Sequence, residues 1–301
     1  MKVAVLSGGF GGAKFVRALV ETLGGEHVTA VVNVGDDVDV LGVRVSPDLD
    51  SVLYSLAGLV DQRRGWGRAD ETWHALETVT QLGGADWFRL GDRDLGLHLV
   101  RSHMLSEGVP LSEFTARAAR ALGVRATLLP ATDDELRTFV VTPAGTFSFQ
   151  EWFVARGHHD EVDGVDVRGS ATPARGVLDA LFAADLLLLG PSNPFVSVGP
   201  IFAVAEIRDA IAARRVPCVA VSPLVGGRAV RGPADRMLER LAGGTSPAHV
   251  ASCYEGLIDA LVIDESDDAA DLDVQPIVTR TFMDDAESRR RVAEAALSVP
   301  V

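Results

Sequence analysis

Short apolar stretches alternate with helix-like stretches along most of this chain, and this alternation restricts the possible folds more than any other feature. Val3 to Leu6 is typical of a buried strand, and Ala13 to Leu23 follows as a helix with apolar residues four positions apart. Further strands are predicted at Val28 to Val34, Val124 to Leu129, Thr138 to Thr142, Leu186 to Leu189, Val216 to Val221, Ala260 to Ile263 and Val274 to Val278. Strands separated by helices indicate parallel βαβ units. We therefore expect an α/β fold with a doubly wound, mostly parallel, Rossmann-like sheet.

The middle of the chain departs from this alternation. Asp70 to Gln81, Asp94 to Ser106 and Leu111 to Leu122 are predicted helices with no strand between them. Phe147 to Val154 alternates aromatic and polar residues and predicts a strand outside the parallel core. No linker divides the chain. The prediction is one α/β domain over residues 1–301 that carries a helical insertion around 61–123.

Charge and cysteine content narrow the classes of function and the cell compartment. The 301 residues carry a formal net charge of −14, which disfavours binding to a nucleic-acid backbone. Cys218 and Cys253 form no motif with each other, so neither a disulfide framework nor a thiolate metal site is predicted. No apolar stretch reaches about 18 residues, and the first residues do not resemble a signal peptide. We expect a cytoplasmic protein that uses neither a membrane nor nucleic acid.

A glycine-rich loop follows the first predicted strand. Gly8, Gly9, Gly11 and Gly12 precede the helix that contains Lys14. Glycines let backbone N–H groups approach a phosphate, and a helix N-terminus adds unsatisfied donors. The alternative is a plain strand-to-helix turn. The spacing matches neither the P-loop nor the dinucleotide fingerprint, which argues against an NAD-dependent dehydrogenase.

Acidic residues follow the second predicted strand. Asn33 lies at the end of this strand, and Asp36, Asp37 and Asp39 come just after it, while Asp48 and Asp50 lie in a segment that becomes helical. Loops at the carboxyl ends of neighbouring parallel strands face one crevice. Carboxylates beside a phosphate need a cation between them, and oxygen ligands suit Mg²⁺. Taken singly, these aspartates are also typical of loops, and Asp50 of a helix N-cap.

Two further segments place polar residues where a ligand could bind. Arg89, Asp92 and Asp94 precede a helix, where mixed charges around a glycine suit an anion clamp and a base, although Asp94 is equally typical of a helix cap. Ser192 and Asn193 lie between prolines after the strand at Leu186 to Leu189. This second segment is either a rigid polar turn or a contact to the ligand.

Taken in order, the motifs resemble one known family. GGFGGAK, NVGDD, SPDLDSVLYSLAG, FRLGDRDLGLHLVR, FQEWFV and GPSNPFVSVGPI run from about Met1 to Ile201. The set resembles the CofD family of 2-phospho-L-lactate transferases. The resemblance implies Mg²⁺-dependent transfer of a phospholactyl or phosphoenolpyruvyl group from a guanosine diphosphate donor to the ribityl hydroxyl of the deazaflavin Fo. It implies release of GMP, formation of (dehydro) coenzyme F420-0, and a homodimer.

The resemblance also implies roles for single residues. Asp36, Asp37 and Asp50 would hold Mg²⁺ against the diphosphate. One of Asp50, Asp92 or Asp94 would orient the attacking hydroxyl, with Asp50 favoured. The remaining candidates would bind substrate: Gly8, Gly9, Gly11, Gly12, Lys14, Asn33, Arg89, Ser192 and Asn193.

Two alternatives stay open from the sequence. Relatives in the same superfamily bind nucleotide sugars and act as non-catalytic regulators; they share the glycine loop and part of the acidic region. The nature of the three-carbon acid is also open. Lys2 and Lys14 are the only lysines, and an arginine-rich composition resembles an actinobacterial member, for which the family implies the phosphoenolpyruvyl donor.

Overall fold

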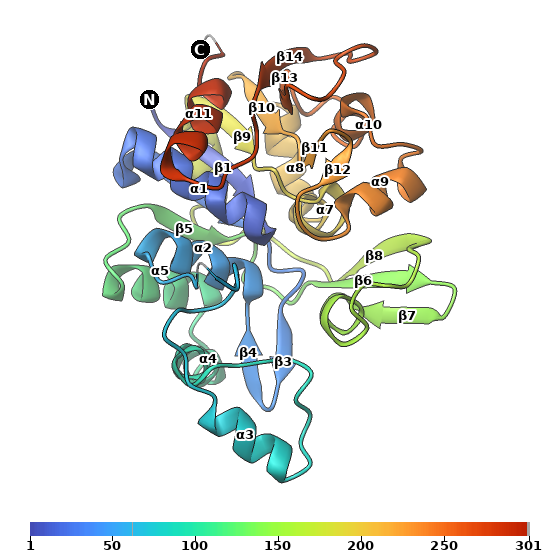
Figure 1. Cartoon of the computed structure of the whole chain (residues 1–301). Coiled ribbons are helices and arrows are strands. Elements are labelled where there is room, and N and C mark those ends of the chain that lie inside the picture. The colour runs from blue at the N-terminus through green and yellow to red at the C-terminus, as the bar shows by residue number, and fades with distance from the viewer. Residues whose placement is uncertain (62, 300–301) are drawn as a thin grey trace.

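The computed structural model describes residues 1–61 and 63–299, and it resolves the chain into one parallel sheet with two smaller additions (Figure 1). None of the helices within these ranges is both long enough and apolar enough to cross a membrane. The elements run in the order β1 Val3–Ser7, α1 Gly9–Leu23, η1 Gly25–His27, β2 Val28–Val32, β3 Val38–Val40, β4 Val43–Val45, α2 Pro47–Ala57, α3 His74–Gln81, α4 Asp92–Ser106, α5 Leu111–Ala121, β5 Thr127–Pro130, β6 Arg137–Thr142, β7 Gly145–Ser148, η2 Glu151–Ala155, β8 Gly164–Arg168, α6 Val177–Ala183, β9 Leu186–Leu189, η3 Pro194–Val198, α7 Gly199–Phe202, α8 Ala205–Ala212, β10 Cys218–Val221, β11 Leu224–Val225, β12 Arg228–Ala229, α9 Ala234–Leu241, α10 Pro247–Ser252, β13 Ala260–Asp264, β14 Gln275–Thr279 and α11 Ala286–Ala296.

The main sheet has seven strands in the order β14-β13-β10-β9-β1-β2-β5, and each neighbouring pair is parallel. Val3 of β1 lies opposite Val28 on one side and Leu186 on the other. The chain moves outward from β1 to β2 and β5, then crosses to β9 on the opposite side. The doubly wound α/β prediction is confirmed, and the order of the strands reverses between β1 and β9.

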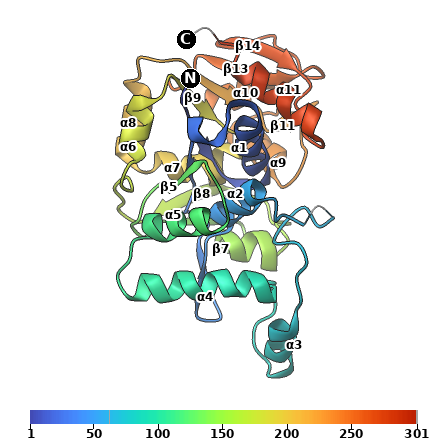
Figure 2. The ribbon, with the colours of Figure 1, turned by 90° about the vertical axis from the view of Figure 1, so that its left-hand side faces the viewer.

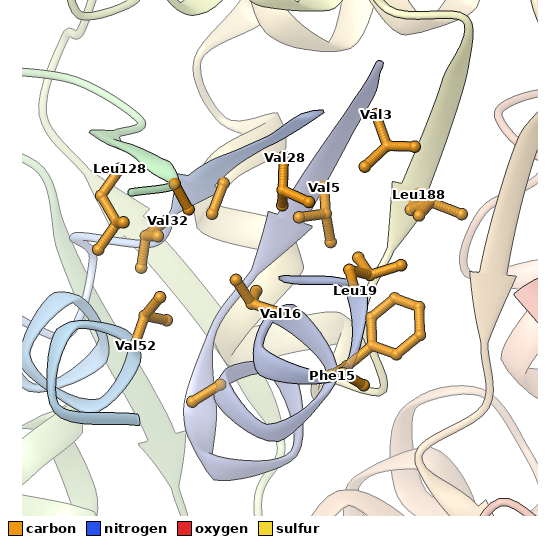
Figure 3. Packing of buried hydrophobic residues seen from close by; sticks show 14 of the residues in the cluster. Val3, Val5, Phe15, Val16, Leu19, Val28, Val32, Val52, Leu128 and Leu188 are labelled. Atoms are coloured by element: carbon orange, nitrogen blue, oxygen red, sulfur yellow. The ribbon is translucent and has the colours of Figure 1, made fainter. Parts of the chain in front are cut away.

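Both faces of the sheet are buried, which explains why its strands are continuously apolar. Val3 and Val5 point to the face covered by α1, α2, α5 and α11, where Phe15, Val16 and Leu19 pack against them (Figure 3). The alternate residues of β1 point to the other face, where they pack with residues of α6, α8, α9 and α10. Side chains alternate between faces along a strand, so one short strand contributes to two cores.

The insertion extends away from the sheet. Helices α3 and α4 and the hairpin β3–β4 protrude on the side opposite the N-terminus (Figures 1 and 2). The three helices predicted in this part of the chain are present. Helix α5, however, packs into the main core through Leu111 and Phe114, whereas α3 buries no residue.

A second addition corrects two predictions. Thr138 to Thr142 is a strand, but its expected place in the parallel sheet is wrong: β6 lies between β7 and β8 in a separate antiparallel sheet. The connection Ala131–Leu136 is too short for the crossover that a parallel neighbour requires. Phe147 to Val154 is a strand only at its start, because Glu151–Ala155 forms a π-helical turn. Phe149 and Phe153 stack four residues apart, with ring centroids 5.2 Å from each other.

Candidate active site

The loops after β1, β2 and β9 meet where the strand order reverses. This is where open parallel sheets bind their ligands. The β1 loop carries the glycines, the β2 loop carries Asn33 and the aspartates, and the β9 loop carries Ser192 and Asn193. The first turn of α2 joins them from the side. The structure therefore brings together three of the four segments that the sequence singled out.

The glycine loop packs tightly against its neighbours. A Cβ atom on Gly8 would lie 2.6 Å from Oδ2 of Asp48, and one on Gly12 would lie 2.7 Å from Oγ of Ser192. The Gly8 amide donates to Oγ of Ser192 at 3.1 Å, and that hydroxyl donates to the Gly8 carbonyl at 2.7 Å. The Gly9 amide donates to Oδ1 of Asp48 at 2.7 Å. The Gly9 amide, which was expected to face a phosphate, thus already donates to the carboxylate of Asp48.

Asn33 links two buried carboxylates. Its amide nitrogen lies 3.0 Å from Oδ2 of Asp48 and 3.4 Å from Oδ1 of Asp36. Gln150, which precedes η2, donates to Oδ2 of Asp36 at 3.2 Å. Ser46 donates to Oδ2 of Asp37 at 2.7 Å. Neutral donors, rather than cations, hold the carboxylates of Asp36 and Asp48.

Burial and mutual repulsion make these carboxylates weak acids. Burial, followed by the charges of Asp48 and Asp37, raises the pKa of Asp36 well above its ordinary value. Burial raises the pKa of Asp37 to about 7 and that of Asp48 to about 6. The three charged forms are disfavoured because water is excluded and no cation bonds to the carboxylates of Asp36 and Asp48.

Asp50 lies two residues after Asp48 but faces α4. Both of its oxygens accept hydrogen bonds from the guanidinium of Arg101, one of them at 3.1 Å. Asp94, also on α4, accepts from the Tyr54 hydroxyl at 2.5 Å and lies 3.4 Å from Nε2 of His98. Burial would raise the pKa of Asp94, but His98 and Tyr54 outweigh it and lower the pKa. The predicted roles of Asp50 and Asp94 stay predictions, and both residues belong to a buried network that the sequence did not indicate.

Three candidates lie outside the crevice. Asp92 accepts from Thr72 and from two amides at the start of α3, so it joins two parts of the insertion. Arg89 lies over the ring of Trp73, 4.8 Å from the ring centroid. Lys14 donates to the carbonyl of Met283 at 2.9 Å, and burial, together with Arg231, lowers its pKa. None of these contacts supports or excludes the predicted roles of Asp92, Arg89 and Lys14 in catalysis and binding, which stay predictions.

The β9 loop is held in place by contacts of Asn193 within the chain. Oδ1 of Asn193 accepts from the amides of Phe195 and Val196 and so caps the turn η3. Its amide nitrogen faces Sδ of Met237 at 3.3 Å. Asn193 therefore has a structural partner on both sides, and Ser192 is engaged with Gly8.

The buried carboxylates suit Mg²⁺ by their donor chemistry. Oδ1 of Asp37 is buried and lacks a hydrogen-bond partner within the described ranges. Hard oxygen donors at Asp36, Asp37 and Asp48 suit Mg²⁺, which commonly uses one or two carboxylates and completes its shell with water and substrate phosphates. Residues 1–61 and 63–299 hold no ready-made group of three ligating side chains. Asp50 fits less well, because Arg101 engages both of its oxygens.

A small cavity of about 100 Å³ adjoins Asp37 on the side of β6. Its polar lining includes Arg44, Arg137 and Asp133. At about 30 Å³ per water it has room for a few water molecules, and it is too small for a nucleotide.

Several partners within the site were missed from the sequence. The sequence places Asp48 in the acidic cluster but assigns it no role of its own. Gln150 and Arg101 act over sequence separations of 114 and 51 residues, for which no local pattern exists. Both lie inside segments that carried the family resemblance, which was the only available signal.

An open parallel sheet with a glycine loop and polar residues at its switch point defines a doubly wound α/β protein that binds its ligand at the strand ends. The chain belongs to the CofD family: the model described as "2-phospho-L-lactate transferase CofD" matches residues 3–295. This confirms the resemblance seen in the motifs.

Relatives and a solved structure agree with the assignment. A protein from Thermobifida fusca named "Phosphoenolpyruvate transferase" is 42% identical over 99% of this chain and 98% of its own. A protein of the same name from Mycobacterium tuberculosis is 41% identical over 89% of each chain. A crystal structure of a Bacillus halodurans protein has a TM-score of 0.67 at 20% identity and covers 99% of both chains, which supports the fold.

Proposed function

We propose that this protein transfers a phosphoenolpyruvyl or phospholactyl group from a guanosine diphosphate donor to the ribityl hydroxyl of the deazaflavin Fo. GMP leaves, and the product is (dehydro) coenzyme F420-0. The observation that carries the proposal is the match to the CofD family over residues 3–295. The names of the relatives favour the phosphoenolpyruvyl donor.

Transfer of a substituted phosphate group requires that the hydroxyl and the phosphorus be aligned and that the charge of the diphosphate be neutralised. The ribityl oxygen attacks the outer phosphorus of the donor, the bond from that phosphorus to the GMP oxygen breaks, and the hydroxyl proton passes to a carboxylate. Such transfers depend on positioning and electrostatic stabilisation more than on covalent participation by the protein. Backbone donors at the start of α1 and the polar β9 loop would orient the donor substrate.

The carboxylates have two tasks in this proposal. Asp36, Asp37 and Asp48 would hold Mg²⁺, which when bound neutralises the diphosphate and stabilises the leaving GMP. A carboxylate on the first turn of α2 would accept the hydroxyl proton. The sequence favoured Asp50 for this step. Asp48 lies on the same turn but is taken up by Mg²⁺ in this proposal, so Asp50 stays the candidate base.

The first experiment is a product assay by mass spectrometry. Purified protein is given Fo and Mg²⁺ with each donor separately, and we expect GMP and the dehydro product from the phosphoenolpyruvyl donor. EDTA should stop the reaction, and added Mg²⁺ should restore it. No product from either donor, with no binding of Fo, would contradict the proposal and favour the nucleotide-sugar-binding regulator.

Variants then separate the carboxylates. Asp48→Ala and Asp50→Ala should each abolish transfer if both residues reach the reacting groups. Asp39→Ala is the matched control, because Asp39 is an exposed acid on β3 that pairs with Arg44. Activity retained in Asp50→Ala would remove Asp50 from both the base role and the metal role that the sequence predicted for it.

A further inference from the structure

Arg101 is the most completely enclosed cation of the described residues, with 1% of its surface exposed. Its Nη1 donates to Oδ2 of Asp50 at 3.1 Å and to the carbonyl of Arg44 at 3.3 Å, and lies 3.2 Å from Nδ1 of His98. Its Nη2 donates to the other oxygen of Asp50. The guanidinium also lies over the ring of Phe114. One side chain from α4 therefore contacts β4, α2 and α5 at once.

Stability alone does not explain this arrangement. Removing both ions of a buried pair from water carries a large desolvation penalty, and apolar replacements are often as stable or more stable. What the pair provides is geometry, since two parallel N–H···O bonds fix the plane of the carboxylate.

The residues that α4 holds lie on either side of Asp48. Arg101 holds the carbonyl of Arg44 and the carboxylate of Asp50, and Oγ of Ser102 accepts from the Arg44 amide at 2.7 Å. Between these two anchors, Ser46 donates to Asp37, and Asp48 accepts from the Gly9 amide. The segment from Arg44 to Asp50 is thus fixed at both ends by α4 and meets the crevice at its centre.

We propose that Arg101 is a positioning residue: from the insertion it fixes the segment Arg44 to Asp50 and thereby holds Asp48 against the glycine loop. The insertion then serves the reaction without contacting substrate. Its role in turnover rests on the proposed function, whereas its effect on the glycine loop does not.

The test that is independent of activity is hydrogen exchange at the Gly9 amide, measured by NMR. Arg101→Lys keeps the charge but loses the paired bonds to Asp50. We expect exchange at Gly9 to become at least about tenfold faster and exchange in β9 to stay unchanged, because only the segment that carries Asp48 loosens. Arg93→Lys, an exposed change on the same helix, is the matched control. Unchanged exchange at Gly9 in folded Arg101→Lys would overturn the proposal.

Kinetics provide the second test. A displaced Asp48 misaligns the reacting groups, so kcat should fall at least about tenfold while KM changes less than about threefold. A wild-type kcat in folded Arg101→Lys would also overturn the proposal. If wild-type protein makes no product, the proposed function fails, and the exchange measurement still decides the role of Arg101.

A third variant covers the case in which Arg101→Lys does not fold. Ser102→Ala removes the hydroxyl that accepts from the Arg44 amide and donates to the His98 carbonyl one turn earlier in α4. Positioning predicts faster exchange at Gly9 in this variant, to a smaller extent. Exchange identical to the wild type would count against it.

Discussion

The two additions to the parallel sheet are attached in different ways. Helix α4 meets the core through charged groups as well as apolar ones: its buried residues are His98, Arg101 and Met104, and Met104 packs in the main core. The antiparallel sheet β7-β6-β8 packs through an apolar cluster that includes Trp152, and the adjoining Gln150 donates to Asp36 through a neutral amide. Ion pairs have defined geometry but fail when one partner is lost, whereas apolar contacts tolerate change. We therefore expect the insertion to respond sharply to single substitutions and the small sheet to respond weakly.

The largest expected effect comes from breaking the charged attachment on one side. Arg101→Met leaves Asp50 buried without its guanidinium partner, which should lower the free energy of unfolding by about 3–5 kcal/mol. Asp50→Asn combined with Arg101→Met should recover much of that loss, because neither charge remains. Urea denaturation measures both variants. Equal stability of the single and double variants would show that the charge of Asp50 is not the cause.

The free energy of unfolding should depend on pH through the buried carboxylate of Asp37. Burial raises the pKa of Asp37 from 3.8 to about 7, so between these values the folded chain binds a proton that the unfolded chain has released. The free energy of unfolding of the metal-free protein should fall as the pH rises through this window, by on the order of 4 kcal/mol for this group. Asp37→Asn should flatten the curve, and Asp39→Asn should not. The same fall in Asp37→Asn as in the wild type would contradict this, and so would a wild-type free energy of unfolding that rises with pH.

Loss of the neutral hydrogen bonds from Gln150 should lower the free energy of unfolding by a smaller amount. Gln150→Leu removes the donor to the carbonyl and the carboxylate of Asp36, which should cost about 1–3 kcal/mol and raise the pKa of Asp36 further. Gln81→Leu, at the exposed end of α3, is the control. A loss as large as that of Arg101→Met would erase the difference between the two attachments.

The smallest effect should lie at the outer end of the insertion. The carboxylate of Glu71 accepts from the amides of Arg93 and Asp94 and thereby caps α4. Glu71→Ala should cost about 1 kcal/mol, as for other helix caps. Glu77→Ala, which removes an exposed ion pair with His74, should change the unfolding midpoint very little. A larger loss in Glu77→Ala than in Glu71→Ala would contradict the capping role.

The sequence predicted the parts of the fold that depend on local patterns. Buried strands such as β1 and β9 are apolar on both faces, and that pattern was readable without knowing their neighbours. The hairpin β3–β4 was not, because its turn is Leu41–Gly42, with φ of 52° and 80°, where Asn-Gly is the usual signal. A leucine in this conformation carries no recognisable turn signature.

The residues of the site also divide into those that a local pattern predicts and those that only long-range contacts define. Gly8, Asn33 and Ser192 were predicted because each follows a strand whose end faces the crevice. The partners of Asp50 and Asp36 could not be predicted, since each bond joins elements that meet only after the insertion and the small sheet have docked. Motif spacing therefore located the crevice and left open which carboxylate faces it.

The reciprocal bonds between Ser192 and Gly8 have a consequence for how a ligand is received. One hydroxyl accepts from the amide and donates to the carbonyl of the same residue, and so joins the β1 and β9 loops across the switch point. The base of the crevice is thus held together by bonds within the chain itself. On the proposed function, binding of the diphosphate there should need little ordering of the backbone, so little affinity should be lost to loop closure. Slow steps in association are then expected outside this base, where the ligand displaces water or draws Asp48 away from Gly9.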